Sequence, residues 1–283
     1  MRALLLTLFI SLLLIMPTFG EGVQEVVYEE IQQQESTEEE LQVEGTEEEL
    51  TQQKNLEMEV KEVNYTLSFR ELGFYKDEYK DEELNMRNAI LRFQSNNNII
   101  VDGELSEETK LVFNYSITAQ EELINDHIEK APTDKKWIVI NKTKRILTLY
   151  EGTKVIKKYP VAQGKLPSYT PVGKFTIVNK AIDPAWGGAG IYKPVKGGVP
   201  ENPLGPRWMG LSIKGGGSYG IHGNNNPYSI GTNASLGCVR MINSDVKELY
   251  ELIQKNTIVW IGTDEKLQEW GVYQESYLSK IQI

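Results

Sequence analysis

The sequence predicts two folded parts: a small all-α domain of three short helices, followed by a larger, mainly β domain that contains one helix. Three observations support this fold class. Apolar residues recur at helical spacing over residues 64–118, the period changes to two from residue 136, and the segment before both parts is too acidic to form a core. A chain of 283 residues is long enough for two modest cores.

The first twenty residues predict an export signal. Arg2 precedes an apolar run over residues 3–16, and small residues precede a possible cleavage after Gly20. The run is shorter than the ~20 apolar residues of a full membrane span, which favours a cleaved signal over an uncleaved anchor. In either case we expect the rest of the chain to lie outside the cytoplasm. No cysteine directly follows the run, so we do not expect a lipid-anchored start.

Residues 21–63 predict a solvated, disordered spacer. They hold fifteen Glu and two Lys, a charge of −13, whereas the whole chain carries −10. The other residues therefore sum to +3, which argues against a basic surface for nucleic acid. So polar a segment cannot bury enough apolar area to offset the entropy lost on ordering. An acidic binding motif is the alternative.

Residues 64–118 predict the small helical domain. An apolar first segment is broken at Gly73, and a helix over residues 81–95 places Leu84, Ala89 and Phe93 at helical spacing. Ser106 is the expected cap of the last helix, with acidic residues in its first turn. The polar residues 119–135 then predict a connector.

Three runs in this helical part resemble the small, three-helix type of peptidoglycan-binding domain. They are residues 71–75, 89–94 and 100–103, the last leading into the capped helix. The resemblance implies binding to the peptidoglycan of the bacterial wall. It departs from the usual pattern at Leu105-Ser106, where the family has Gly-Pro. A helical spacer without a ligand is the alternative.

Residues 136–263 predict the mainly β domain. Residues 137–140 and 145–150 flank an Asn141-Lys142 turn and read as a hairpin. Further strands are predicted at residues 155–161, 173–178, 211–213 and 258–262, and a helix at residues 244–254. Residues 264–283 are expected to form a C-terminal tail.

The only cysteine of the chain lies sixteen residues after one of its two histidines. A single thiol in an exported protein forms no internal disulfide, so Cys238 is either an apolar filler or a reactive group. An imidazole such as that of His222 is the usual means of activating a thiol for attack on a carbonyl carbon. Gly237 allows backbone donors to approach an oxyanion closely. Arg240 can favour the thiolate, hold a substrate carboxylate, or both.

The conjunction of these groups within some twenty residues favours catalysis over separate structural roles. One Cys and one His are too few ligands for zinc. We therefore expect neither a metal nor another cofactor.

The residues around His222 and Cys238 carry a second, closer resemblance to a known family. The residues Ile221-His222-Gly223, followed by the run from Ser235 to Met241, resemble the signature of the L,D-transpeptidase catalytic domain. Residues 170–175 and 202–208 resemble two further motifs of that family, in the same order. Many members have His where this chain has Leu236. The order His before Cys separates the chain from papain-like wall peptidases, in which the Cys comes first. The resemblance implies a β-sandwich or mixed sheet with one helix.

The same resemblance implies roles for single residues. Cys238 is expected to be the nucleophile, His222 the general acid and base, the Gly223 carbonyl the group that orients His222, and Gly237 part of the oxyanion hole. Contacts to substrate are expected from Arg240, Ser235, Tyr219 and Asn224. Residues 181–206 resemble the loop that covers the family's site, and an ordinary surface loop is the alternative.

The implied reaction is attack on the bond between the third residue of a peptidoglycan tetrapeptide stem and its terminal D-Ala. Transfer of the acyl group to a side-chain amine of a second stem gives a three-to-three cross-link. Transfer to water makes the protein an L,D-carboxypeptidase, and a non-catalytic wall-binding protein is the third alternative. The family further implies a secreted or cell-wall-associated enzyme that carbapenems acylate.

Overall fold

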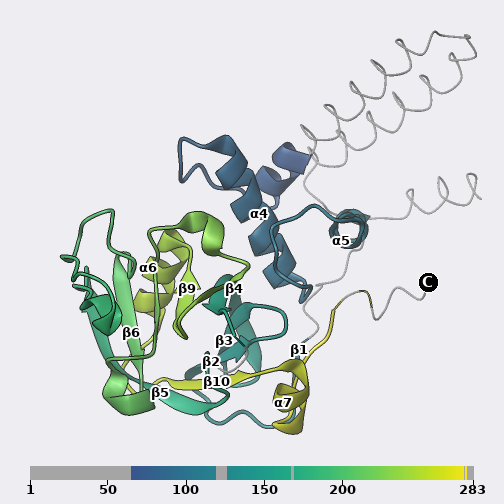
Figure 1. Cartoon of the computed structure of the whole chain (residues 1–283). Helices are drawn as coiled ribbons and strands as arrows, with labels where there is room; N and C mark the ends of the chain where they lie inside the picture. The colour runs from purple at the N-terminus through teal and green to yellow at the C-terminus, as the bar shows by residue number, and fades with distance from the viewer. Residues whose placement is uncertain (1–64, 119–125, 167–168, 277, 279–283) are drawn as a thin grey trace, which may run out of the picture. The chain divides into compact units, whose positions relative to one another are not determined.

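The computed structural model describes residues 65–118, 126–166, 169–276 and 278. The predicted export signal and acidic spacer lie outside the described residues, as do residues 119–125 of the predicted connector. The described elements, shown in Figure 1, all fall in one compact unit, Glu62–Ile283. Among them, no helix is both long and apolar enough to cross a membrane.

The helical part has three helices: residues 65–71, α4 (Glu82–Asn96) and α5 (Glu107–Thr118). Asp81 caps α4, because its side chain accepts a hydrogen bond from the Leu84 amide at 3.1 Å. Ser106 caps α5 through the Thr109 amide at 3.2 Å. Both helices therefore begin within a residue or two of the positions that the sequence indicated.

Aromatic rings form the core of the helical part. The ring centroids of Phe69, Phe93 and Phe113 lie 5.0–5.6 Å from one another, in tilted and edge-to-face pairs. The other buried members of this cluster are Tyr75, Ala89, Ile90, Ile99 and Val112. Residues 65–118 thus have a small core of their own.

The β part is one nine-stranded sheet that closes on itself. Its strands are β2 (Lys136–Asn141), β3 (Ile146–Glu151), β4 (Lys154–Gly164), β5 (Gly173–Ile182), β6 (Arg207–Leu211), β7 (Gly220–His222), β8 (Asn233–Ser235), β9 (Val239–Met241) and β10 (Ile258–Gly262). The order is β3-β2-β10-β5-β6-β7-β9-β4-β8, and β3 also pairs with β4. The expected mainly β fold with a mixed sheet is confirmed, since the sheet holds both parallel and antiparallel pairs. Pairing of β3 with β4 as well as with β2 makes the sheet barrel-like.

Helix α6 (Asn243–Leu252) follows β9 directly and packs on the interior of the sheet. Val246 and Leu249 of this helix are fully buried among apolar side chains of the strands, such as Ile138, Leu149 and Val259. The helix was predicted at residues 244–254. Because it is packed in the core, it anchors the chain that leaves β9.

Several short elements differ from the sequence expectation. β1 (Asp126–Ile128) pairs antiparallel with β11 (Val272–Gln274), and α7 (Asp264–Glu269) precedes β11. The residues expected as connector and tail thus form a second small sheet and a second helix of this part. The strand expected at residues 211–213 ends at Leu211, because Lys214 and Gly215 have positive φ angles in the 3₁₀ segment η2 (Ile213–Gly216).

The helical and β parts share an interface. Leu91 of α4 and Val101 pack in one buried cluster with Ile146, Ala162, Ile230 and Ile242 of the β part. The buried guanidinium of Arg92 also bonds Asp245 of α6 at 3.0 Å and Glu78 at 2.8 Å. Charged groups removed from water in this way require partners, so the interface is specific as well as apolar.

Candidate active site

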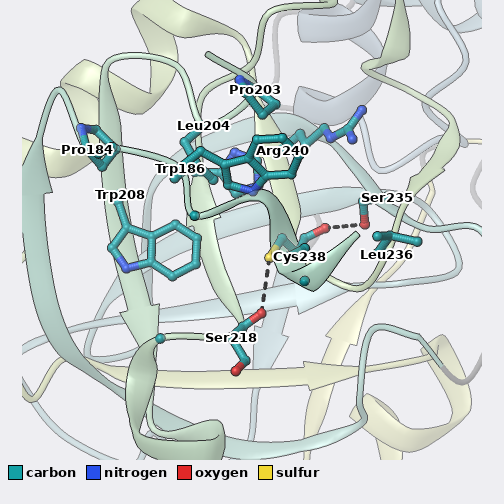
Figure 2. A pocket seen from close by; sticks show the side chains of 16 residues that line it. Pro184, Trp186, Pro203, Leu204, Trp208, Ser218, Ser235, Leu236, Cys238 and Arg240 are labelled. Atoms are coloured by element: carbon teal, nitrogen blue, oxygen red, sulfur yellow. Dashed lines mark hydrogen bonds between the residues drawn. The ribbon is translucent and has the colours of Figure 1, made fainter. Parts of the chain in front are cut away.

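Two neighbouring parallel strands bring the predicted catalytic pair together. β7 pairs with β9, and His222 at the end of β7 lies in register with Arg240. Cys238 immediately precedes β9, so its side chain reaches the same surface as that of His222. Both line one pocket of about 590 Å³ (Figure 2).

Much of the remaining wall of the pocket comes from β6 and from the loop between β5 and β6. Trp208 of β6 lies on one side of Cys238, and the loop contributes Trp186 and Leu204 (Figure 2). The other lining residues are Pro184, Ala185, Gly187, Ala189, Gly190, Pro203, Gly217, Ser218, Ser235, Leu236 and Arg240. None of these described lining residues is acidic, and Arg240 is the cation among them.

The Cys238 sulfur is held by the chain that enters β7. Its thiol donates a hydrogen bond to the Ser218 carbonyl oxygen at 3.6 Å (Figure 2). Burial raises the pKa of the thiol. The Gly220 amide and the Arg240 guanidinium lower this pKa, but by less than burial raises it. The resting sulfur is therefore a protonated thiol, and Arg240 does not by itself maintain a thiolate.

His222 is held in one tautomer. Its Nδ1 lies 2.7 Å from the Gly223 carbonyl oxygen, and because a carbonyl only accepts, Nδ1 carries the proton. The side chain is 4% exposed and stacks on Trp208 with ring centroids 5.8 Å apart. Burial, and secondly the positive charge of Arg240, lower the pKa of His222 to about 4. Backbone hydrogen bonds at Gly223 and Leu204 raise this pKa, but by less. The imidazole is therefore neutral at physiological pH, with Nε2 as its basic nitrogen.

The residues before Cys238 form a tight loop that requires glycine. Gly237 has φ of +135°, and a Cβ there would lie 2.6 Å from the Tyr169 carbonyl oxygen and 2.7 Å from the Tyr219 ring. Its amide donates to Ser235 Oγ at 3.0 Å, and Ser235 Oγ donates to the Cys238 carbonyl at 2.6 Å. In this resting geometry the Gly237 amide is engaged, and Ser235 bridges the Gly237 amide and the Cys238 carbonyl. The expected roles of Gly237 in the oxyanion hole and of Ser235 in substrate binding stay predictions.

Thr170 is a site residue whose role was not predicted. Its hydroxyl donates to the Gly237 carbonyl at 3.0 Å and accepts from the Gly164 amide at 2.9 Å. The Thr170 carbonyl in turn accepts from Lys142 Nζ at 2.5 Å. The motif at residues 170–175 was noted in the sequence, but nothing there indicated that its threonine reaches the chain beside Cys238.

The four predicted substrate contacts lie in different environments. Arg240 lines the pocket, and its Nε is buried without a hydrogen-bond partner among the described residues. Asn224 is 3% exposed and donates to the Met241 carbonyl at 2.7 Å. Tyr219 packs against the apolar core of the sheet. Asn224 and Tyr219 are not among the residues that line the pocket, and their expected contacts to substrate stay predictions.

The loop that lines the pocket is closed on itself. The buried Asn202 side chain donates to the carbonyls of Pro184 at 2.7 Å and Lys196 at 2.8 Å, and accepts from the Leu204 amide at 2.9 Å. A β-bridge joins Trp186 to Val195. Pro184, Trp186 and Leu204 all line the pocket, so the segment expected as a covering loop forms one of its walls.

Metal ligands are not gathered in the part of the chain that the structure describes: no three or more His, Cys, Asp or Glu side chains meet in a metal-binding arrangement there. The chemistry of this pocket is that of a thiol, a neutral imidazole and a guanidinium.

Comparison with known proteins decides the family. The family model of the L,D-transpeptidase catalytic domain matches residues 135–261. The putative L,D-transpeptidase YqjB of Bacillus subtilis (strain 168) is 37% identical over 147 residues, which cover 51% of this chain and 81% of the relative. The chain belongs to the L,D-transpeptidase family. The putative L,D-transpeptidase YkuD of the same strain is 35% identical over 170 residues, 59% of this chain and 92% of the relative.

Among solved structures, an L,D-transpeptidase (residues 123–326) from Xylanimonas cellulosilytica DSM 15894 is similar with a TM-score of 0.44 and 19% identity, over 62% of this chain and 78% of that one. The L,D-transpeptidase family predicted from the three motifs is confirmed by the match and the relatives. The helical part lies outside the matched residues, and the roles of single residues in this L,D-transpeptidase stay predictions.

Proposed function

We propose that this L,D-transpeptidase acts outside the cytoplasm on peptidoglycan stem peptides and forms three-to-three cross-links through a thioester at Cys238. The observation that carries the proposal is the joint pocket of Cys238 and His222, in which the Gly223 carbonyl leaves Nε2 of His222 as the basic nitrogen. A thiol and an oriented neutral imidazole are the components of cysteine acyl transfer.

The proton begins on the sulfur. The Cys238 thiol leaves the Ser218 carbonyl by rotation about its side chain and gives its proton to His222 as the sulfur attacks the stem carbonyl carbon. His222 then returns the proton to the nitrogen of the leaving D-Ala, and the thioester remains. An amine of a second stem attacks the thioester, loses its proton to His222, and releases the Cys238 thiol. Deprotonation is thus coupled to attack and needs no stable thiolate.

The oxyanion requires backbone donors. The Cys238 amide is the first candidate, and the Gly237 amide becomes the second when it turns from Ser235 Oγ. The partnerless Nε of Arg240 is suited to a carboxylate of the stem, because a buried guanidinium gains most from a charged acceptor. This assigns substrate binding to Arg240 and positioning to Ser235.

Hydrolysis of the same thioester is the competing outcome. The pocket walls of Trp186, Trp208 and Leu236 are large and apolar, which disfavours water as the acceptor and favours an amine delivered by a second stem. Incubation with a disaccharide-tetrapeptide tests this. Cross-linked dimer as main product supports the proposal, disaccharide-tripeptide alone indicates a carboxypeptidase, and no turnover indicates a non-catalytic wall-binding protein.

We further propose that the helical part binds the wall, as its resemblance implies, and that carbapenems acylate Cys238. Co-sedimentation of the Cys238→Ala protein with purified sacculi tests the first point, since binding is then read without turnover. Absence of added mass on the parent protein after carbapenem treatment would contradict the second.

A further inference from the structure

Helix α4 contacts the loop that joins the two catalytic residues. Residues 223–237 connect His222 to Cys238, and Arg87 of α4 donates from Nη2 to the Ile230 carbonyl of this loop at 2.8 Å. The same nitrogen donates to the Asp102 carbonyl at 3.0 Å. One guanidinium therefore joins the turn of the helical part to the middle of the catalytic loop.

Apolar packing fixes the same point. Ile230 is fully buried in the cluster that contains Leu91 of α4. The next residue, Gly231, has φ of +81°, and a Cβ there would lie 2.7 Å from Leu91 Cδ2 and 3.3 Å from Asp102 Cα. The helical part thus presses directly against the loop backbone. At the loop surface, the Tyr228 hydroxyl donates to the Asp81 carboxylate at 2.8 Å.

From this point the loop leads straight to the nucleophile. Its end is β8, whose last residue, Ser235, clasps the Gly237 amide and the Cys238 carbonyl. Ser235 thus lies five residues after Ile230, and its two hydrogen bonds set the backbone of Cys238.

The same helix also holds the chain after the nucleophile. Arg92 bonds Asp245 at 3.0 Å and Ser244 Oγ at 3.2 Å, both in the first turn of α6. At the start of this helix, the Asn243 side chain accepts from the Asn224 amide at 2.9 Å and donates to the Asn224 carbonyl at 3.0 Å. Through Asn243, the end of β9 is tied to the residues that follow His222.

We propose that α4 is a positioning element for the nucleophile: Arg87 holds the chain before Cys238, and Arg92 holds the chain after it. The inference rests on the proposed function, in which Cys238 attacks the stem. The family domain begins at residue 135, so these contacts come from outside it. The helical part is then a support of the active site, whether or not it binds the wall.

The test compares two Arg→Met variants of the full chain. Arg87→Met keeps the apolar stem and removes the donors to Ile230 and Asp102. Arg70→Met is the matched control, because Arg70 forms an exposed ion pair with Asp77 inside the helical part at 2.6 Å. Arg87→Lys restores one charged donor and is the conservative rescue.

Two rates are measured well below the melting temperature. Cys238 is the only cysteine of the chain, so alkylation by iodoacetamide reports its accessibility without any transpeptidase activity. Formation of the acyl-enzyme from disaccharide-tetrapeptide reports its alignment. In Arg87→Met we expect acylation to fall about tenfold, because small displacements of reacting groups cost one to two orders of magnitude in rate. Alkylation should rise, since a loosened loop exposes the thiol.

Arg87→Lys should lie between parent and Arg87→Met, and Arg70→Met should match the parent in both rates. Equal rates in Arg87→Met and Arg70→Met would overturn the proposal, as would a fall of both rates in proportion to lost folded protein. Should the parent fail to acylate, the proposed function fails, while the alkylation rates still decide the positioning role. Should Arg87→Met not fold, Tyr228→Phe replaces it in the test. We expect its acylation rate to fall about twofold and its alkylation rate to rise about twofold. Unchanged rates in Tyr228→Phe would overturn the proposal.

Discussion

Replacing Thr170 by Val tests how the nucleophile loop is held. The two side chains have nearly the same shape, but Val lacks the hydroxyl that donates to the Gly237 carbonyl at 3.0 Å and accepts from the Gly164 amide at 2.9 Å. Thr170 is 1% exposed, so water does not replace the lost partners. The substitution therefore leaves one backbone acceptor and one backbone donor unpaired in the interior.

The magnitude follows from those two bonds. A buried hydrogen bond between neutral groups contributes about 1 kcal/mol, and an orphaned partner costs about 1–3 kcal/mol. We expect Thr170→Val to lower the free energy of unfolding by about 2–3 kcal/mol, and the acylation rate to fall as well, because the Gly237 carbonyl is one bond from the Cys238 amide. Thr170→Ser keeps both hydrogen bonds and should lose about 1 kcal/mol through its missing methyl group.

Urea unfolding gives the stability difference from the midpoints, provided that the slope is the same in all three proteins. Acyl-enzyme formation is followed by intact-mass spectrometry on the same preparations. The reasoning is refuted when Thr170→Val is as stable as Thr170→Ser, or when it acylates at the parent rate.

Two further predictions concern the imidazole and the covering loop. The unfolded chain binds a proton at His222 below pH 6.5, but the folded chain only below about 4, so stability falls as the pH drops through this window. At about 1.36 kcal/mol per pH unit, the loss in the free energy of unfolding reaches about 3 kcal/mol. Calorimetry at different pH values should find that His222→Asn lacks this loss. Asn202→Leu removes the hydrogen bonds that close the loop, so KM for the tetrapeptide should rise severalfold at a temperature where the variant is fully folded. An unchanged KM contradicts a role of the loop in binding.

Local signals predicted much of the fold. The cap at Ser106, the alternation around Asn141-Lys142 and the apolar face of α6 each depend on neighbouring residues, and each element lies close to its predicted position. β7 and β9 were not predicted as strands, because three residues are too few to show a period of two. Closure of the sheet depends on β3 meeting β4 as well as β2, and hairpin signals do not specify where the second edge goes.

The site shows the same division. Cys238 and His222 were identified from their chemistry and spacing, and the structure places both in one pocket. Asn224 and Tyr219 lie beside the motif in sequence, but the Asn224 side chain donates to the Met241 carbonyl and Tyr219 packs, partly buried, against the core. The bond from Arg87 to Ile230 joins residues 143 positions apart. Contacts of this kind arise when the helical part packs on the β part, so no local sequence pattern predicts them.

The most direct test of the account is the mass of the protein during turnover. After brief incubation with disaccharide-tetrapeptide, the parent should carry a disaccharide-tripeptide in thioester linkage, and peptide mapping should place it on Cys238. The Cys238→Ala protein should keep its own mass and form no product, with an unchanged fold because the substitution removes little volume. Cross-linked product from Cys238→Ala at the parent rate, or turnover by the parent without any adduct on Cys238, would contradict the central claim.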